Sequence, residues 1–157
     1  NDLTLSDITA NTDVFYIGGT KVGALFGEAV VIRNEELKKD FRYNIKQRGG
    51  MLAKGRLLGI QFLTLFEENR YFDISAHAAR LAEKLKDELT KMGVKFYINQ
   101  QFPILPDAVL AELKKKYSFA YQERMDETHS AVRFCTCWAT KEENVDMLLA
   151  DIRELLA

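Results

Sequence analysis

Two apolar runs near the start of the sequence constrain the fold most strongly, because each is typical of a buried strand and no other strand lies close by. Residues 14–17 and 27–32 flank Gly18-Gly19 and one lysine, Lys21. A pair of strands is only marginally stable in water by itself. We therefore expect the neighbouring strands to lie elsewhere, and the chain, which begins with an asparagine, to be a piece of a longer protein.

The rest of the sequence alternates between helical and strand patterns. A helix is expected from an Asn34 N-cap to about residue 47, and a second over about 52–69, which is apolar around most of its circumference and should be buried on several sides. From residue 71 onward the pattern is α-β-β-α-β-β-α. Its expected helices are 73–92, 107–116 and one opened by a Thr140-Lys141-Glu142-Glu143 capping box, and its expected strands are 94–98, 102–105, 118–124 and 130–137.

This order predicts a mixed α/β chain in two domains. Residues 1–69 would be the end of a larger domain that carries Lys21 and two linking helices. Residues 70–157 would form a small α+β domain, with helices on one face of an antiparallel sheet.

Composition argues against several classes of protein. The 157 residues are 47% hydrophobic with a formal net charge of −1, and the positive charge is scattered. No apolar run reaches the roughly 18–20 residues of a membrane span, and no basic segment precedes an apolar one near the N-terminus. We expect a cytoplasmic protein that binds neither membranes nor nucleic acid.

The two cysteines, Cys135 and Cys137, do not suggest a disulfide or a metal site. Two residues apart on a strand, they share a face, but such a short spacing strains a disulfide. No histidine lies near them in sequence to complete a metal site. We expect buried, reduced thiols and no bound metal.

Lys21 is the first candidate for chemistry. A lysine beside glycines is most often a solvated turn residue, yet the runs on both sides of Lys21 are among the most apolar in the chain. Desolvation lowers the pKa of an amine, and the neutral amine attacks carbonyl carbon to form a Schiff base. Lys21 is therefore predicted to be partly desolvated and reactive.

Arg133 is the second candidate. Strand alternation places it on the face shared by Ala131, Cys135 and Cys137, inside an otherwise apolar strand. A guanidinium there is costly to bury without an anion, and its planar fork matches a carboxylate. The alternative is a structural role at a sheet edge or in a pair with Glu123 or Asp126.

Four segments carry a family resemblance. Gly18-Gly19-Thr20-Lys21 with Gly27-Glu28-Ala29, and Val132-Arg133-Phe134 with Trp138-Ala139-Thr140, resemble the family of threonine aldolases and β-eliminating lyases. These enzymes use pyridoxal 5'-phosphate (PLP) and have the aspartate-aminotransferase type of fold, PLP fold type I. The resemblance covers almost the whole chain but only the C-terminal portion of such an enzyme, namely two strands of the large-domain sheet, linking helices and the small domain.

The resemblance implies roles for three residues. Lys21 would hold PLP as an internal aldimine, and Arg133 would bind the substrate carboxylate. In the family, Gly-Gly-Met is often followed by an arginine that reaches the PLP phosphate; here Gly49-Gly50-Met51 is followed by Leu52-Ala53, and Lys54 lies close by. Lys54 either supplies this cation, across a dimer interface, or is an ordinary exposed lysine. No catalytic role is expected for His77 or His129. The His77 side chain is expected to be solvated or to cover an interface.

The function implied is cleavage of a β-hydroxy amino acid, such as threonine or allo-threonine, to glycine and an aldehyde (acetaldehyde). The alternatives are another PLP-dependent β-eliminating lyase or aminotransferase-like enzyme, or a non-catalytic α+β module for dimerisation or small-molecule binding. In the family, the groups that hold the PLP ring and phosphate precede the lysine strand. We therefore expect this chain to be inactive alone, and to work with the missing N-terminal half in a homodimer or homotetramer.

Overall fold

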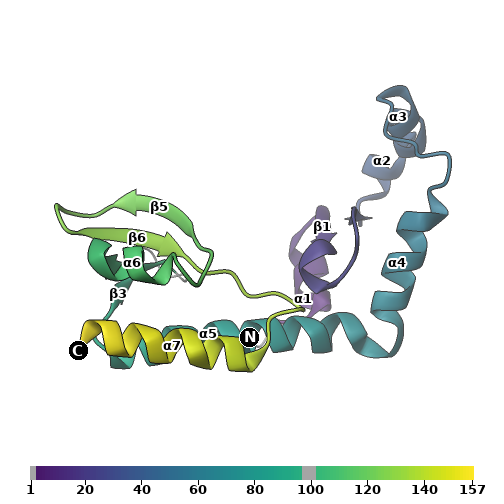
Figure 1. Cartoon of the computed structure of the whole chain (residues 1–157). Coiled ribbons are helices and arrows are strands. Elements are labelled where there is room, and N and C mark those ends of the chain that lie inside the picture. The colour runs from purple at the N-terminus through teal and green to yellow at the C-terminus, as the bar shows by residue number, and fades with distance from the viewer. Residues whose placement is uncertain (1–2, 97–101) are drawn as a thin grey trace. The chain divides into compact units, whose positions relative to one another are not determined.

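The chain folds into two compact units, residues 1–72 and 73–157, each of which is described here by itself. The computed structural model describes residues 3–96 and 102–157 (Figure 1). The end of the strand predicted over 94–98 lies outside the described residues. Both units combine helices with a small antiparallel sheet, so the predicted mixed α/β architecture is confirmed.

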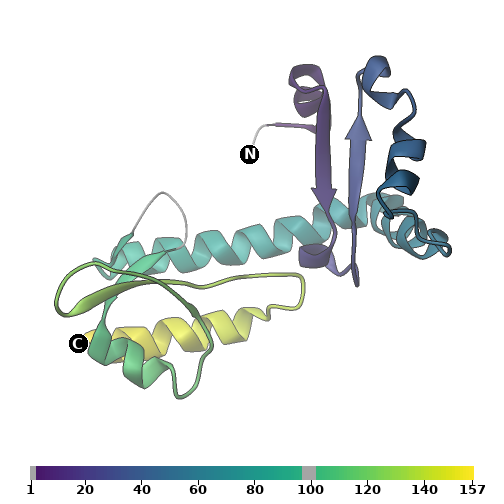
Figure 2. The same cartoon turned by 90° about the horizontal axis from the view of Figure 1, so that it is seen from above.

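The first unit is built around one antiparallel pair of strands, which Figure 2 shows side by side. Tyr16 lies opposite Val30 in the register. None of the strand residues is buried, and the Tyr16 side chain is 70% exposed. The expectation of buried strands is thus wrong for this chain, because within the described residues no further strand pairs with them. The elements of this unit are α1 (Leu5–Asn11), β1 (Val14–Gly18), the 3-10 turn η1 (Thr20–Val22), β2 (Glu28–Ile32), α2 (Glu35–Lys38), α3 (Phe41–Gln47), α4 (Arg56–Phe66) and η2 (Glu67–Asn69).

Helix α1 is absent from the sequence-based prediction, although its N-terminus carries a recognisable signal. The Thr4 hydroxyl accepts a hydrogen bond from the Asp7 backbone N–H at 3.3 Å, and the Asp7 carboxylate accepts one from the Thr4 N–H at 2.7 Å. This capping box satisfies two backbone donors that a helix start leaves unpaired. The Thr-x-x-Asp spacing could have identified the helix.

The two linking helices differ from their predicted bounds. The helix expected over 34–47 is split into α2 and α3, because Asp40 adopts a left-handed backbone with φ of 57°. The helix expected over 52–69 begins only at Arg56 as α4. Three of its apolar side chains, Leu57, Ile60 and Leu63, are 49–62% exposed, so the expected burial on several sides is not found in this chain.

The second unit has the predicted element order, and its sheet is antiparallel throughout with strand order β3-β4-β6-β5. Helices α5 and α7 lie along one side of this sheet (Figures 1 and 2). Helix α5 ends before Gly93, whose φ of 80° suits a helix C-terminus, as predicted. The elements are α5 (Arg70–Lys91, which begins in the first unit), β3 (Lys95–Phe96), β4 (Pro103–Pro106), α6 (Asp107–Leu113), β5 (Ala120–Arg124), β6 (His129–Arg133) and α7 (Glu142–Leu156).

One hydrophobic core holds the second unit together. It takes apolar side chains from α5, β4, α6, β6 and α7, and the leucine stripe predicted for α5 lies in it. Two details differ from prediction. Leu156 is 37% exposed, and the N-cap of α7 is Lys141 without a side-chain hydrogen bond, since the Thr140 hydroxyl contacts Cys137 instead. The buried core members are Leu81, Leu85, Leu89, Leu105, Val109, Leu110, Leu113, Val132, Phe134, Val145, Leu148, Leu149 and Ile152.

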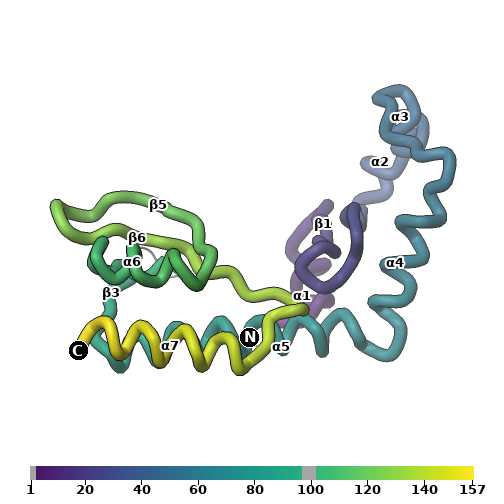
Figure 3. The backbone as a smooth tube through the Cα atoms, in the orientation of Figure 1, coloured from purple at the N-terminus to yellow at the C-terminus, as the bar shows by residue number. Residues whose placement is uncertain are grey.

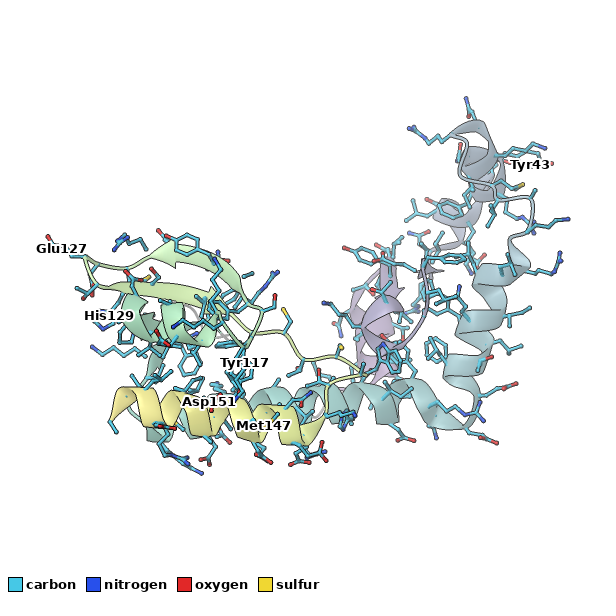
Figure 4. The ribbon with its side chains drawn as sticks, in the orientation of Figure 1. Tyr43, Tyr117, Glu127, His129, Met147 and Asp151 are labelled. Carbon is cyan, nitrogen blue, oxygen red and sulfur yellow. The ribbon has the colours of Figure 1, made fainter. Side chains whose placement is uncertain are left out.

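Truncating a side chain should lower the free energy of unfolding more when that side chain is buried in this core than when it is exposed. Ile152 is fully buried on α7, whereas Met147, labelled in Figure 4, lies on the same helix and is 47% exposed. Ile152→Ala should lower the free energy of unfolding by about 2–5 kcal/mol, because it removes buried methyl groups and leaves a cavity. Met147→Ala should change it by less than about 0.5 kcal/mol. Urea unfolding checks both, and equal losses would contradict the assigned core.

Candidate functional site

Lys21 lies in the short 3-10 turn η1 between the two strands of the first unit. The Gly19 carbonyl accepts hydrogen bonds from the backbone N–H groups of Val22 at 3.1 Å and Ala24 at 3.0 Å, which closes the turn. Gly19 is buried, and an added Cβ would lie 2.7 Å from the Ala24 Cβ, so this position requires glycine. The buried side chains of Val22 and Ala24 then anchor the turn, with Lys21 between Gly19 and Val22.

The Lys21 side chain is exposed, so the predicted partial desolvation of its amine is not found in this chain. The apolar residues that follow Lys21, Val22 and Ala24, are buried instead. Neighbouring residues of a 3-10 turn point to different sides, so a buried Val22 is compatible with an exposed Lys21. Among the residues that the structure describes, none forms an ion pair or side-chain hydrogen bond with Lys21. Its amine is therefore free to react with a carbonyl compound.

Helix α4 supports the loop that follows Lys21, chiefly through Gln61. The Gln61 side-chain carbonyl accepts a hydrogen bond from the Leu25 N–H at 2.6 Å, and its amide donates to the Phe26 carbonyl at 3.3 Å. Gly27 has a φ of 89°, and a Cβ there would lie 2.4 Å from Leu58 of the same helix. Sequence reasoning missed Gln61, although a polar residue inside an apolar helix was a usable signal.

Lys54 lies in the exposed turn just before α4. Its backbone carbonyl accepts a hydrogen bond from the Leu57 N–H at 2.9 Å, whereas the described part of the chain gives its side chain no ion pair and no hydrogen bond. Its ammonium is thus available to an anion, and its role as a phosphate ligand stays a prediction.

Arg133 is the last residue of β6, where it lies opposite Ala120 of β5. Its side chain is exposed, while the residues on either side, Val132 and Phe134, are in the core. Strand β6 ends at Arg133, whereas the sequence predicted a strand that continues to residue 137. Within the described residues, Arg133 forms no ion pair with Glu123, with Asp126 or with any other acid. The guanidinium fork is free to receive a carboxylate.

The cysteines are less buried than predicted. Cys135 is exposed and Cys137 is half-buried, because β6 ends before them and the chain leaves the sheet. The described residues contain no group of three or more His, Cys, Asp and Glu side chains that could hold a metal ion.

A second polar cluster lies at the turn between β5 and β6, where Figure 4 labels Glu127 and His129. The Asp126 carboxylate accepts hydrogen bonds from the backbone N–H groups of Thr128 at 2.7 Å and His129 at 2.8 Å, and its oxygen lies 3.1 Å from the His129 Nδ1. The backbone N–H of Thr128 is the main cause that lowers the pKa of Asp126 from 3.8 to about 2. Because these donors close the turn, the cluster is structural.

This cluster predicts a pH dependence of stability. A carboxyl whose pKa is lower in the folded state stabilises the fold above its unfolded pKa of 3.8, and this contribution is lost as the pH falls through about 2. Asp126→Asn should therefore flatten the dependence of the thermal midpoint on pH between 2 and 4. Glu127→Gln, at the same turn, is the control. Parallel curves for wild type and Asp126→Asn would contradict the assignment.

Lys21 and Arg133 each have, by themselves, the chemistry that one part of a site for PLP or for an amino acid would need. Lys21 offers a primary amine on a turn held by glycine, Arg133 offers a guanidinium, and neither side chain has an ion pair within residues 3–96 and 102–157. Lys21 belongs to the first unit and Arg133 to the second. None of the helices in the described ranges has both the length and the apolar character that a bilayer span requires.

Comparison with known proteins points to one family. No protein-family profile matches the chain. Two curated relatives are each 30% identical to it: the low specificity L-threonine aldolase of Pseudomonas sp. (strain NCIMB 10558), over 94% of this chain and 43% of that protein, and that of Pseudomonas aeruginosa, over 92% and 42%. A solved structure of Leishmania major threonine aldolase matches all of this chain with a TM-score of 0.95 and 41% identity.

The chain spans less than half the length of these proteins, 42–43% of the curated relatives and 47% of the solved chain. Such coverage agrees with the expectation that it corresponds to a portion of the enzyme. The curated relatives and the solved structure carry the same name, threonine aldolase. This chain is therefore similar in sequence and in fold to threonine aldolases over nearly its whole length.

Proposed function

We propose that this chain is the C-terminal portion of a PLP-dependent aldehyde-lyase that cleaves a β-hydroxy amino acid, with threonine or allo-threonine as substrate. One observation carries the proposal: Lys21, on the glycine-held turn between β1 and β2, presents an amine without a partner among the described residues. The similarity to threonine aldolases over nearly the whole chain supports it.

Lys21 would hold the cofactor covalently and then move a proton at its own Nζ. PLP, when bound, supplies an electron sink for the bond that breaks next to the amino group. The Gly19 turn and the Gln61 bonds to the following loop hold the backbone that carries the Lys21 amine, and the bound cofactor would fix the amine itself. An exposed ammonium on this turn needs a further protein surface to exclude water from it.

Arg133 would bind the carboxylate of the substrate. Its guanidinium can donate two parallel hydrogen bonds to one carboxylate, which fixes both the position and the orientation of an amino acid. Its backbone is held by the β5–β6 register and by Phe134, whose ring packs edge-on against Phe119 at 5.5 Å between centroids. Lys54 would donate to the phosphate of the cofactor as a compact cation.

The missing N-terminal half and a second subunit would complete the protein. The first unit exposes many large apolar side chains, and exposed apolar surface often marks a site of contact with another protein surface. We therefore assign these positions to contacts with the rest of the enzyme and with a homodimer or homotetramer partner. The most exposed of them are Leu3, Tyr16, Leu25, Val30, Tyr43, Ile60 and Leu63.

The experiment uses the full-length gene product that carries this chain, with its intact mass measured first. Incubated with PLP and threonine, this protein should release equimolar glycine and acetaldehyde, and the isolated 157-residue chain should release neither. If the full-length protein released 2-oxobutanoate and ammonia instead, β-elimination would replace aldol cleavage. A natural product of 157 residues that binds no PLP would favour a non-catalytic binding module.

A further inference from the structure

The chain that follows Arg133 leaves the sheet and reaches α7 through residues 134–140, which include a turn at 138–139 and which we call the 134–140 segment. Figure 3 shows it as a long stretch of tube without secondary structure. A segment of this kind has no strand or helix bonds of its own to fix it. A backbone hydrogen bond from the Thr140 N–H to the Cys137 carbonyl, at 3.0 Å, closes a turn within it, and two side-chain hydrogen bonds join it to the first half of α5.

His77 of α5 makes the first of these bonds. Its Nε2 lies 2.9 Å from the Thr140 carbonyl, and its Nδ1 lies 3.4 Å from a nitrogen of Arg80. Arg80 can only donate, so Nδ1 is assigned as the acceptor and Nε2 carries the proton that Thr140 accepts. His77 is half-buried, and the expectation of a solvated or interface-covering side chain misses this bond.

Neighbouring bonds hold the same segment. The Thr136 hydroxyl donates to the Ala78 carbonyl of α5 at 2.9 Å, and the Thr140 hydroxyl accepts from the Cys137 N–H at 2.9 Å. Beyond the segment, Arg80 forms an ion pair with Glu142 of α7 at 3.0 Å, so Arg80 joins the His77 contact to the start of that helix. The segment is thus bound to α5 at two points and closed on itself at a third.

We infer that His77 is a positioning residue for Arg133. Phe134 fixes the backbone on the sheet side of the segment, and His77 with Thr136 fixes its far side. Because both ends are held, the chain leaving Arg133 has one course, and the guanidinium is presented from one direction. This inference rests on the proposed function, in which Arg133 receives the substrate carboxylate.

The first test measures the hold on the segment in the 157-residue chain. Iodoacetamide should alkylate the half-buried Cys137 about tenfold faster in His77→Ala than in wild type, because one hydrogen bond no longer opposes opening. The exposed Cys135 serves as the internal reference and should change little. His77→Gln, which keeps an N–H donor, should restore the slow rate, and Glu83→Ala, an exposed position on α5, should match wild type. Circular dichroism confirms that each variant is folded.

The second test measures positioning in the full-length protein. His77→Ala should raise the KM for threonine about tenfold with little change in kcat, and His77→Gln should reverse the rise. An unchanged rate of Cys137 alkylation in His77→Ala would overturn the inference that His77 holds the 134–140 segment. Faster alkylation of Cys137 in His77→Ala with an unchanged KM for threonine would overturn only the inference that His77 positions Arg133. A full-length wild type that never cleaves threonine would overturn the proposed function, and the positioning with it, whatever the alkylation rates.

Discussion

Lys21→Ala is expected to lower kcat for threonine cleavage by the full-length protein by at least about 1,000-fold, because it removes both the covalent anchor of the cofactor and the nearby proton-transfer group. Gly19 and the buried Val22 hold the turn without help from the lysine side chain. The variant should therefore keep its fold. Steady-state release of acetaldehyde measures the loss.

Lys39→Ala is the matched control for this change. Lys39 is an exposed lysine of the same unit, at the end of α2, and the described residues give it no ion pair. Its removal should leave kcat within about twofold of wild type, as for surface substitutions in general. Activity that survives Lys21→Ala but not Lys39→Ala would place the reactive amine elsewhere.

Arg133→Ala is expected to raise the KM for threonine about 100- to 1,000-fold, since loss of one partner of a desolvated charge pair costs about 3–5 kcal/mol. Stability should change little, because Arg133 is exposed and unpaired within the part of the chain that the structure describes. The variant thus separates recognition from folding. Urea unfolding and the KM are measured on the same preparation.

Arg133→Lys sharpens this test, because it keeps the charge and removes the planar fork. If a carboxylate binds in the two-bond geometry, the lysine variant should recover only a minor part of the lost affinity. Full recovery would show that Arg133 acts as a simple positive charge. An unchanged KM in both variants would show that Arg133 does not bind the substrate carboxylate and would favour a structural role.

The second unit was predictable because its signals are strong and agree with one another. The leucine stripe of α5 has a helical period, Gly93 ends the helix, and the element order that follows is the observed one. The ends of elements were less predictable. The apolar pattern continues past Arg133, yet β6 stops there, because Thr136 bonds to the Ala78 carbonyl of α5 rather than to a strand.

The first unit was harder to predict, because several apolar side chains of its strands and of α4 have too little packed against them among the described residues to be buried. Apolar side chains on β1, β2 and α4 read as buried, but Tyr16, Val30 and Ile60 are more than half exposed. The same reasoning overestimated the burial of Lys21. Periodicity reports which face a residue occupies, whereas burial depends on what packs against that face.

One measurement tests the central claim most directly. The full-length protein is loaded with PLP, reduced with borohydride to fix any bond between the cofactor and a lysine, digested, and mapped by mass spectrometry. The account predicts the reduced cofactor on the peptide that contains Lys21, in one copy per chain. Its attachment to Lys54 or to any other lysine in place of Lys21, or its absence from every peptide, would contradict the account.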